Sequence, residues 1–309
     1  MNDRKIVVVG SYNQDITLKL AHLPAPGETC LSLGRLDAPG GKGSNQAVQA
    51  ARCGAPTTMI AAIGADGAGD AALAMWARVG VATAGVVRLT DTGTGMASIL
   101  IDAAGENIIV VDSGANACLS PAHVDAAAAH IRDAGLVIAQ LETPPDATRR
   151  AFEIARAAGV TTLLNAAPAP ESIDAELLAL TDILAVNEGE GRALSGHDLP
   201  AAIGEALLAK VGRAVVITLG PAGAMVFEHS RPPLKGAAPK VEVVDTTGAG
   251  DAFIGAFAAR WVETGDMGEA LAWGLAGGGL ACTAVGATAS LADRGQIAAL
   301  AAGGAKATQ

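Results

Sequence analysis

Short apolar runs rich in β-branched residues alternate along this chain with longer, alanine-rich segments of helical periodicity. The pattern predicts strands at Ile6–Gly10, Thr58–Ile63, Leu136–Leu141, Thr162–Asn165, Ile183–Val186 and Val215–Leu219. It predicts helices at Ser44–Cys53, Ala71–Val79, Pro121–Ala134, Ala147–Ala158 and Ala252–Glu263. Such alternation favours right-handed βαβ units and a mostly parallel central sheet. Because several strands are apolar throughout, helices are expected on both faces, which gives a three-layer α/β sandwich.

Two segments break this alternation and have no helix of their own. Residues 16–36 contain strand-like pieces around a turn at Pro24–Gly27, and residues 95–111 have the pattern of a hairpin. We expect a small β-sheet lid, formed by about residues 16–39 and 95–112, that covers a site on the α/β body. Its exposed face is expected to pair with a second copy, giving a homodimer. No repeat or long linker divides the chain, so residues 1–309 are expected to form one domain.

Composition narrows the possible classes of function. Half of the 309 residues are hydrophobic, 17% are charged, 3% are aromatic, and the net charge is −10. These values exclude a disordered chain, and they argue against a nucleic-acid partner because no basic footprint or stacking platform is present. The cysteines and histidines are scattered and form no C-x-x-C or H-E-x-x-H pair, so neither a zinc site nor a disulfide framework is predicted. A reducing, cytoplasmic location is expected.

One uncharged stretch, Ala270–Ala292, is long enough to span a membrane. It contains five glycines and few large apolar residues, which favours a buried helix followed by a loop. The apolar run Ile6–Val9 is too short for the hydrophobic part of a signal peptide. No membrane partner is therefore expected.

The segment Asp245–Phe253 carries the strongest chemical signal. It follows a strand-like run at Val241–Val244 and opens a predicted helix. Gly248 and Gly250 permit positive φ and close approach of a ligand to the backbone. Amides of such a loop, together with a helix N-terminus, form an anion site that suits a transferring phosphoryl group. Asp251 would repel a resting anion, so it either takes a proton from an attacking hydroxyl or caps the helix.

A second glycine-rich segment, Gly40–Ala47, is similar to a phosphate-binding loop but lacks the P-loop spacing, because Gly43 follows Lys42. Its glycines would let a ligand contact the backbone. Ser44 or Asn45 would either cap the following helix or bind hydroxyls.

Two polar pairs follow predicted strands. Asn13 and Asp15 share a face of an extended chain, so they either bind vicinal sugar hydroxyls or lie in a turn. Asn187 and Glu190 are one helical turn apart, so they either hold a hydrated Mg²⁺ or form a solvated helix start.

Taken together, these motifs resemble those of the ribokinase-like (PfkB) carbohydrate kinases. Gly40–Ala47 is similar to the N-terminal di-glycine signature of that family, and Asp245–Asp251 meets its C-terminal D-T-x-G-A-G-D signature in full. The likeness runs essentially end to end, and shorter segments such as Pro26–Thr29 and Gly114–Asn116 add to it. The resemblance implies the ribokinase-like fold and ATP-dependent phosphorylation of the primary hydroxyl of a sugar. The sugar it favours is D-ribose, which would give ribose 5-phosphate.

The resemblance also implies a role for each matching residue. The catalytic group would comprise the base Asp251 and the anion-hole residues Gly248, Ala249 and Gly250. Sugar binding would involve Asn13, Asp15, Gly41, Lys42, Gly43, Asn45, Glu142 and Asp251. ATP binding would involve Asn187, Glu190, Thr218, Leu219, Gly220, Pro221, Ala222, Gly223 and Gly250, with Mg²⁺ held through water by Asn187 and Glu190. A monovalent cation, usually potassium, would lie at Asp245, Thr247, Ala281, Ala284, Gly286 and Ser290.

Three positions depart from the usual family pattern. They are Asn165–Pro168, where N-P-A-P is usual, Asp112–Ser113, and Leu275, where some relatives have a histidine near adenine. These changes leave open a kinase of the same family that acts on fructose, a deoxy-keto acid or a nucleoside. A non-catalytic sugar-binding protein on this fold is a further alternative, against which the intact Asp251 argues. A nicotinamide dehydrogenase is disfavoured because no G-x-G-x-x-G follows the first strand.

Overall fold

The parallel strands of the central sheet all have their carboxyl ends at the same edge of the sheet. The computed structural model describes residues 5–304. The strands are β1 (Ile6–Val9), β2 (Asn13–Lys19), β3 (Gly34–Gly40), β4 (Thr57–Gly64), β5 (Val81–Leu89), β6 (Met96–Ile101), β7 (Asn107–Asp112), β8 (Leu136–Ala139), β9 (Thr161–Asn165), β10 (Ile183–Asn187), β11 (Ala214–Thr218), β12 (Ala224–Glu228) and β13 (Leu234–Gly236). The helices are α1 (Lys42–Arg52), α2 (Gly67–Val79), α3 (Pro121–Ala126), α4 (Ala128–Arg132), α5 (Pro145–Ala157), α6 (Ala175–Ala179), α7 (Glu188–Ser195), α8 (Pro200–Leu208), α9 (Ala249–Thr264), α10 (Met267–Ala281) and α11 (Arg294–Gly304).

Nine strands form the main sheet, in the order β13-β12-β11-β10-β9-β8-β1-β4-β5. The strands from β11 to β5 pair in parallel, and β12 and β13 add an antiparallel edge. The chain runs from β1 outward to β4 on one side and later returns to β8 on the other side. A topological switch point therefore lies between β1 and β8, which is where open α/β sheets bind ligands.

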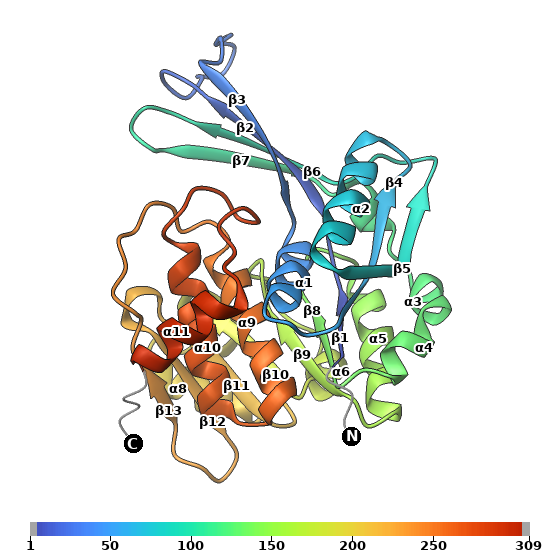
Figure 1. Cartoon of the computed structure of the whole chain (residues 1–309), viewed down its shortest axis with the longest axis vertical. Coiled ribbons are helices and arrows are strands. Elements are labelled where there is room, and N and C mark those ends of the chain that lie inside the picture. Colours follow the sequence, from blue (N-terminus) through green and yellow to red (C-terminus); the bar gives the residue numbers. More distant parts are fainter. Residues whose placement is uncertain (1–4, 305–309) are drawn as a thin grey trace.

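Successive side chains of the central strands point into two separate cores. Val8 and Ile138 belong to a core shared with α1, α2, α9, α10 and α11, whereas Val7 and Val137 face a core shared with α3, α4, α5, α6 and α8. This alternation explains why these strands are apolar throughout. Figure 1 shows the two helical layers on either side of the sheet. The predicted three-layer α/β sandwich with a mostly parallel sheet is confirmed.

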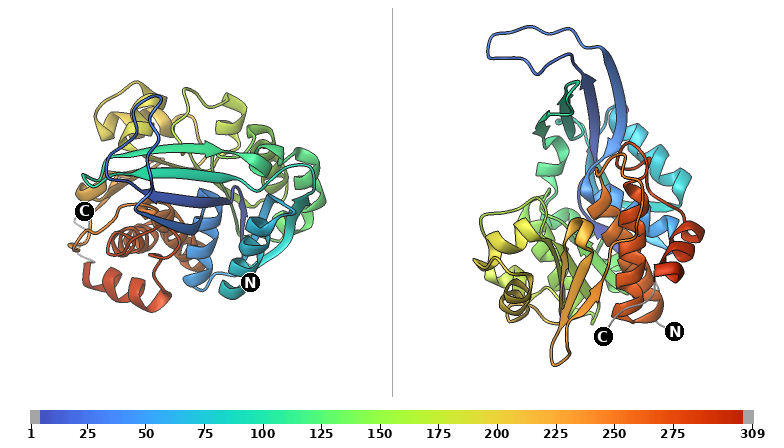
Figure 2. Two further views of the ribbon diagram at one scale, coloured as in Figure 1. Left: turned by 90° about the horizontal axis from the view of Figure 1, so that it is seen from above. Right: turned by 90° about the vertical axis from the view of Figure 1, so that its left-hand side faces the viewer.

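A second sheet, in the order β3-β2-β6-β7, stands apart from the main sheet. β2 pairs antiparallel with β3 and parallel with β6, and β7 returns antiparallel beside β6. Figure 2 shows this small sheet and the long loop between β2 and β3 projecting away from the α/β body. The predicted small β-sheet is therefore present.

Two of the predicted elements were wrong in detail. The helix expected at Pro121–Ala134 is two short helices, α3 and α4, because hydrogen bonds around Ala127 pass to the third rather than the fourth preceding residue. The run Val241–Val244 is not a strand. Within the described part of the chain no strand pairs with it; instead, the Val244 amide donates to the Cys282 carbonyl at 2.8 Å, and Val244 is exposed.

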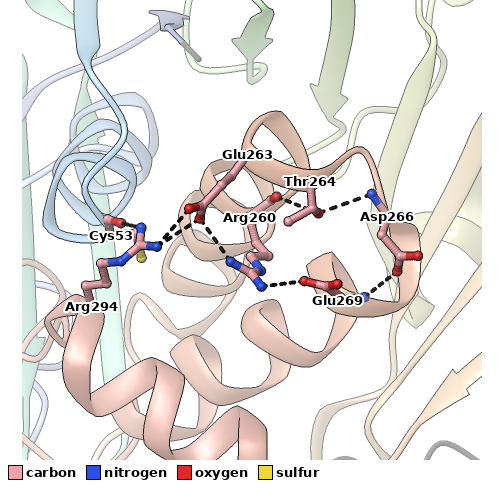
Figure 3. A network of polar contacts seen from close by, with 7 residues as sticks. All are labelled: Cys53, Arg260, Glu263, Thr264, Asp266, Glu269 and Arg294. Carbon is pink, nitrogen blue, oxygen red and sulfur yellow. Dashed lines mark hydrogen bonds and ion pairs between the residues drawn. The ribbon is translucent and has the colours of Figure 1, made fainter. Parts of the chain in front are cut away.

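The helices α9, α10 and α11 are joined at their ends by a polar network (Figure 3). Arg294 pairs with Glu263 at 2.9 Å and donates to the Cys53 carbonyl at 2.7 Å. Arg260 bridges Glu263 and Glu269. Both guanidinium groups also lie near the indole of Trp273, with their carbon atoms 5.0 and 5.1 Å from the ring centroid. This network fixes α9, whose other end carries Asp251.

Within residues 5–304, no helix combines the length and apolar character needed to cross a membrane. The uncharged stretch at Ala270–Ala292 forms most of α10 and then leaves the helix through turns, as predicted.

Candidate active site

A cavity of about 230 Å³ opens at the carboxyl ends of the parallel strands. Strand ends supply Asn165, Asn187 and Thr218, and the opposite wall comes from the first turn of α9. The full lining is Lys42, Asn165, Ala167, Ala185, Val186, Asn187, Glu190, Thr218, Gly248, Gly250, Asp251 and Ile254. The edge of the sheet therefore gathers polar side chains from sequence positions far apart.

Helix α1 begins against the loop after β1, and its first residue is Lys42. Gly41 has φ +87°, and a Cβ there would lie 2.8 Å from the backbone of Tyr12, so only glycine fits without strain. No side chain caps α1, so the alternative that Ser44 or Asn45 caps this helix is wrong. The carboxylate of Glu142 accepts from the Lys42 amide at 2.9 Å and from the Ser11 hydroxyl. A negative charge at this helix N-terminus is favourable.

Asn13 and Asp15 lie in strand β2 rather than in a turn. Asn13 is buried, and its carbonyl oxygen accepts from the Asn116 amide at 2.8 Å, which fixes the orientation of the side chain. The Asp15 carboxylate lies against Gly40, where an added Cβ would approach it to 2.3 Å. Burial, together with the nearby carboxylates of Glu142 and Asp251, raises the pKa of Asp15 to about 7. Three acidic side chains therefore converge on the space between the small sheet and the cavity.

Asp251 lies in the first turn of α9 and is buried. The N-cap position belongs to Gly248, at φ +78°, where a Cβ would lie 2.9 Å from Ala287. The Asp251 carboxylate instead accepts from the Asn45 amide at 2.9 Å and the Gln46 amide at 3.0 Å. The alternative that Asp251 merely caps its helix is therefore wrong. Burial raises the pKa of Asp251, while nearby Lys42 and the two amide donors oppose the rise.

The two donors to Asp251 are themselves held by further polar contacts. The Gln46 amide also donates to the Asn165 carbonyl oxygen at 2.9 Å, and its own carbonyl accepts from Gln140 at 2.6 Å. The hydroxyl of Thr288 lies 2.7 Å from the Asn45 carbonyl oxygen and 2.8 Å from the backbone carbonyl of Pro39 in β3. The carboxylate is thus held in one orientation by a connected network.

On the far side of the cavity, Asn187 and Glu190 cap the start of α7 reciprocally. The Glu190 amide donates to the Asn187 side chain, and the Asn187 amide donates to the Glu190 carboxylate, both at 2.8 Å. Glu190 is buried, and that burial raises its pKa, although the charge of Lys42 opposes the rise. A carboxylate in a polar cavity, with oxygen sites left beyond this one bond, fits a hydrated Mg²⁺.

The predicted potassium residues lie on two segments that meet beside α9. Asp245 accepts from the Thr247 amide at 2.9 Å and from the Gly286 amide at 2.8 Å. Among residues 5–304, no cationic side chain pairs with Asp245. A carboxylate without an ionic partner offers hard oxygen donors of the kind that fit a simple cation.

Of the residues predicted for function, the cavity brings together Lys42, Asn187, Glu190, Thr218, Gly248, Gly250 and Asp251. Asn13, Asp15, Gly41, Gly43, Asn45 and Glu142 lie next to it, through the contacts described above. Leu219 to Gly223 form the turn between β11 and β12 and do not line it.

Sequence reasoning missed Ser11, Gln46, Asn165 and Thr288 as site residues. Asn165 ends a strand that had been predicted, so its position at a carboxyl strand end was an available signal. Gln46 lies inside the recognised glycine-rich motif, but nothing in the sequence indicates that it contacts Asp251, 205 positions away.

Comparisons with known proteins identify a family and several relatives that this chain resembles. The model of the pfkB family carbohydrate kinases matches residues 3–294. Ribokinase of Mus musculus is 39% identical over 259 residues, covering 82% of this chain and 80% of the relative. Ribokinase of Staphylococcus aureus (strain COL) is 38% identical over 294 residues, covering 93% and 96%. The solved structure of Arabidopsis thaliana ribokinase complexed with ribose and ATP has a TM-score of 0.91 at 32% identity and covers 96% of this chain and 98% of its own.

Proposed function

Because this chain belongs to the pfkB family of carbohydrate kinases, we propose that it transfers the γ-phosphoryl group of ATP to the primary hydroxyl of D-ribose. The product is ribose 5-phosphate. Ribose is favoured because ribokinases match over nearly the whole chain, including the small sheet. The observation that carries the proposal is the Asp251 carboxylate, held by Asn45 and Gln46 in the same cavity as Gly248 and Gly250.

Asp251 is the base in this mechanism. The hydroxyl of the sugar gives its proton to a carboxylate oxygen of Asp251 as that hydroxyl oxygen attacks the γ-phosphorus. The bond from this phosphorus to the oxygen of the β-phosphate breaks, and ADP leaves. Burial raises the pKa of Asp251, which makes the carboxylate a stronger base than an exposed aspartate. The amides of Asn45 and Gln46 keep it ionised and hold its direction before substrate binds.

The transferring group gathers negative charge, and the N-terminal turn of α9 faces it. Gly248 and Gly250 line the cavity without side chains, so their backbone is open to a phosphoryl oxygen. The positive end of the α9 dipole and the Lys42 ammonium add to the stabilisation.

Two metal ions complete the proposal. Glu190 and Asn187 would hold Mg²⁺ through water, and this ion would neutralise phosphate charge. Asp245, Thr247, Ala281, Ala284, Gly286 and Ser290 would hold K⁺, which would add positive charge next to the anion site. The donor chemistry of both sets, described above, supports these assignments.

The sugar is bound between the cavity and the small sheet, which acts as the lid. Asn13, Asp15 and Glu142 would contact its hydroxyls, and the backbone at Gly41 and Gly43 would lie beside it. Both glycines pack against the backbone of residues 10–13, where a Cβ would clash. A carboxylate pair suits a polyol because each oxygen accepts a hydroxyl hydrogen bond. Closure of the lid would exclude water and limit hydrolysis of ATP.

We also propose that two copies pair through their lids in a cytoplasmic homodimer. The outer strand β7 exposes Ile108, Ile109, Val110 and Val111, and Val110 is 63% exposed. Leu31, in the loop between β2 and β3, is 88% exposed. Large apolar side chains exposed along an open edge strand are typical of an interface. Sedimentation equilibrium should give the mass of a dimer for the parent protein and the mass of a monomer for Val110→Asp. The mass of a monomer for the parent protein would reject the pairing.

The test of function is an ADP-release assay with MgATP and a panel of ribose, 2-deoxyribose, fructose and adenosine, with and without potassium. We expect the highest kcat/KM on ribose. Asp251→Asn should lose roughly 10²- to 10⁴-fold in kcat while sugar binding persists. Turnover mainly on another sugar would keep the mechanism and move the substrate. No turnover on any sugar would favour a non-catalytic sugar-binding protein.

A further inference from the structure

The long loop between β2 and β3, residues 20–33, gathers three metal-binding side chains that no catalytic role uses. His22 Nε2 lies 2.7 Å from Glu28 Oε1 and 3.7 Å from Cys30 Sγ. All three ligand atoms lie within 4.8 Å of one another. This cluster could not be predicted from the sequence, because the spacing H-x₅-E-x-C matches none of the usual metal motifs.

The fold of the loop holds these side chains in place. The Glu28 amide donates to the Ala25 carbonyl at 2.9 Å, which closes a turn, and Gly27 within it has φ +85°. The other carboxylate oxygen of Glu28 accepts from the Ala25 amide at 2.9 Å. One oxygen of Glu28 is thus fixed by the backbone, while the other faces His22. Outer hydrogen bonds orient the ligands of known metal sites in the same way.

We propose that His22, Glu28 and Cys30 form a Zn²⁺ site at the tip of the lid. An imidazole, a carboxylate and a thiolate are the ligand types that zinc prefers, and a sulfur ligand disfavours Mg²⁺ and Ca²⁺. Two anionic ligands balance the charge of the ion. The Cys30 thiol gives its proton to solvent when it becomes a ligand.

The geometry needs only a small adjustment. Tetrahedral zinc with ordinary bond lengths separates its ligand atoms by roughly 3.3–3.7 Å. The His22–Cys30 distance already fits, and the His22–Glu28 contact opens by roughly 0.7 Å through rotation of exposed side chains. Water takes the fourth position, because the cluster is at the surface. Bound zinc would join both ends of the loop and reduce its freedom.

The first test measures binding of Zn²⁺ to the chelator-treated full-length protein in the absence of nucleotide, by competition with a chromophoric chelator. Co²⁺ serves as a spectroscopic probe. We expect one equivalent per chain and a thiolate-to-cobalt charge-transfer band. Cys30→Ser should abolish the band, and Cys30→Ser, His22→Ala and Glu28→Gln should each weaken Zn²⁺ affinity at least about tenfold.

Matched controls are Cys118→Ser and His197→Ala, which remove an exposed cysteine and an exposed histidine elsewhere. Both should bind like the parent protein. A Cys30→Ser variant that binds Zn²⁺ normally, or a parent protein without the cobalt band, would overturn the site.

A second measurement tests the effect on the loop. Zn²⁺ should slow amide exchange in peptides that cover residues 20–33 and leave the turn at residues 102–106 unchanged. Zinc binding that slows exchange equally in both regions, or in neither, would contradict a site at this loop.

Discussion

The hydrogen bond from Gln46 to Asp251 offers a sharp test of how the base is prepared. Gln46→Leu keeps the approximate size of the side chain but removes the donor 3.0 Å from the Asp251 carboxylate. It also leaves Gln140 and Asn165 without their contacts to this side chain. A hydrogen bond to a charged group contributes about 1.5–3 kcal/mol. If that energy is expressed in the transition state, kcat falls roughly 10- to 150-fold.

The pH dependence separates a positioning role from general damage. Gln46 is one of the groups that lower the pKa of Asp251 against the effect of burial. Its removal therefore raises this pKa further, and the acid limb of the kcat profile should move to higher pH. Because the base must be ionised, part of the lost activity should return as the pH rises. The KM for ribose should change little.

Gln49→Leu is the matched control. Gln49 lies one turn further along α1, is equally buried, and donates to the Ala292 carbonyl at 3.0 Å rather than to Asp251. Thermal unfolding of both variants would show how far each destabilises the fold. An equal loss of kcat in both variants, or an unmoved acid limb in Gln46→Leu, would refute the assigned role of Gln46.

Three further predictions concern other regions. Arg294→Ala should lower the free energy of unfolding by about 1–3 kcal/mol, because it removes the half-exposed ion pair with Glu263 and the stacking on Trp273. Arg294→Lys should have an intermediate effect. Denaturation curves that do not change would contradict this prediction. Burial and neighbouring carboxylates raise the pKa of Asp15 from 3.8 to about 7, so the folded state retains a proton that the unfolded chain releases, and stability falls as pH rises across this window. Asp15→Asn should therefore raise Tm at pH 8 but not near pH 3, and it should lower the affinity for ribose. Scanning calorimetry measures the first effect, and calorimetric titration with ribose measures the second. Asp245→Ala should abolish stimulation by potassium in the ADP-release assay, and persistent stimulation would place the ion elsewhere.

Much of the architecture could be predicted because it depends on local patterns. Apolar runs identify the central strands, and the helix-free segments identify the small sheet. The exceptions are positions where tertiary contacts decide. Nothing in the alanine-rich sequence near Ala127 marks the break between α3 and α4, and the apolar residues of Val241–Val244 have the composition of a strand but no neighbouring strand with which to pair.

The site was predictable to the extent that its residues lie in motifs. Asp251 and Lys42 belong to such segments and do line one cavity. The contacts that orient them were not predictable, because they join residues from distant parts of the chain. Thr288 reaches Asn45 across 243 positions, and no local pattern encodes that contact.

The small sheet is inserted into the α/β body at closely spaced points. Asn13 is the first residue of β2 and pairs with Gly40, the last residue of β3. Gly41 follows directly, and α1 starts at the next residue. The hairpin of β6 and β7 joins beside them, where Gln14 pairs with Met96. Small sheets of different length or surface are therefore exchangeable at these junctions without altering α9. Under the roles proposed above for the two parts, selectivity for substrates can diverge among descendants of one ancestor while the residues that transfer the phosphoryl group are inherited unchanged.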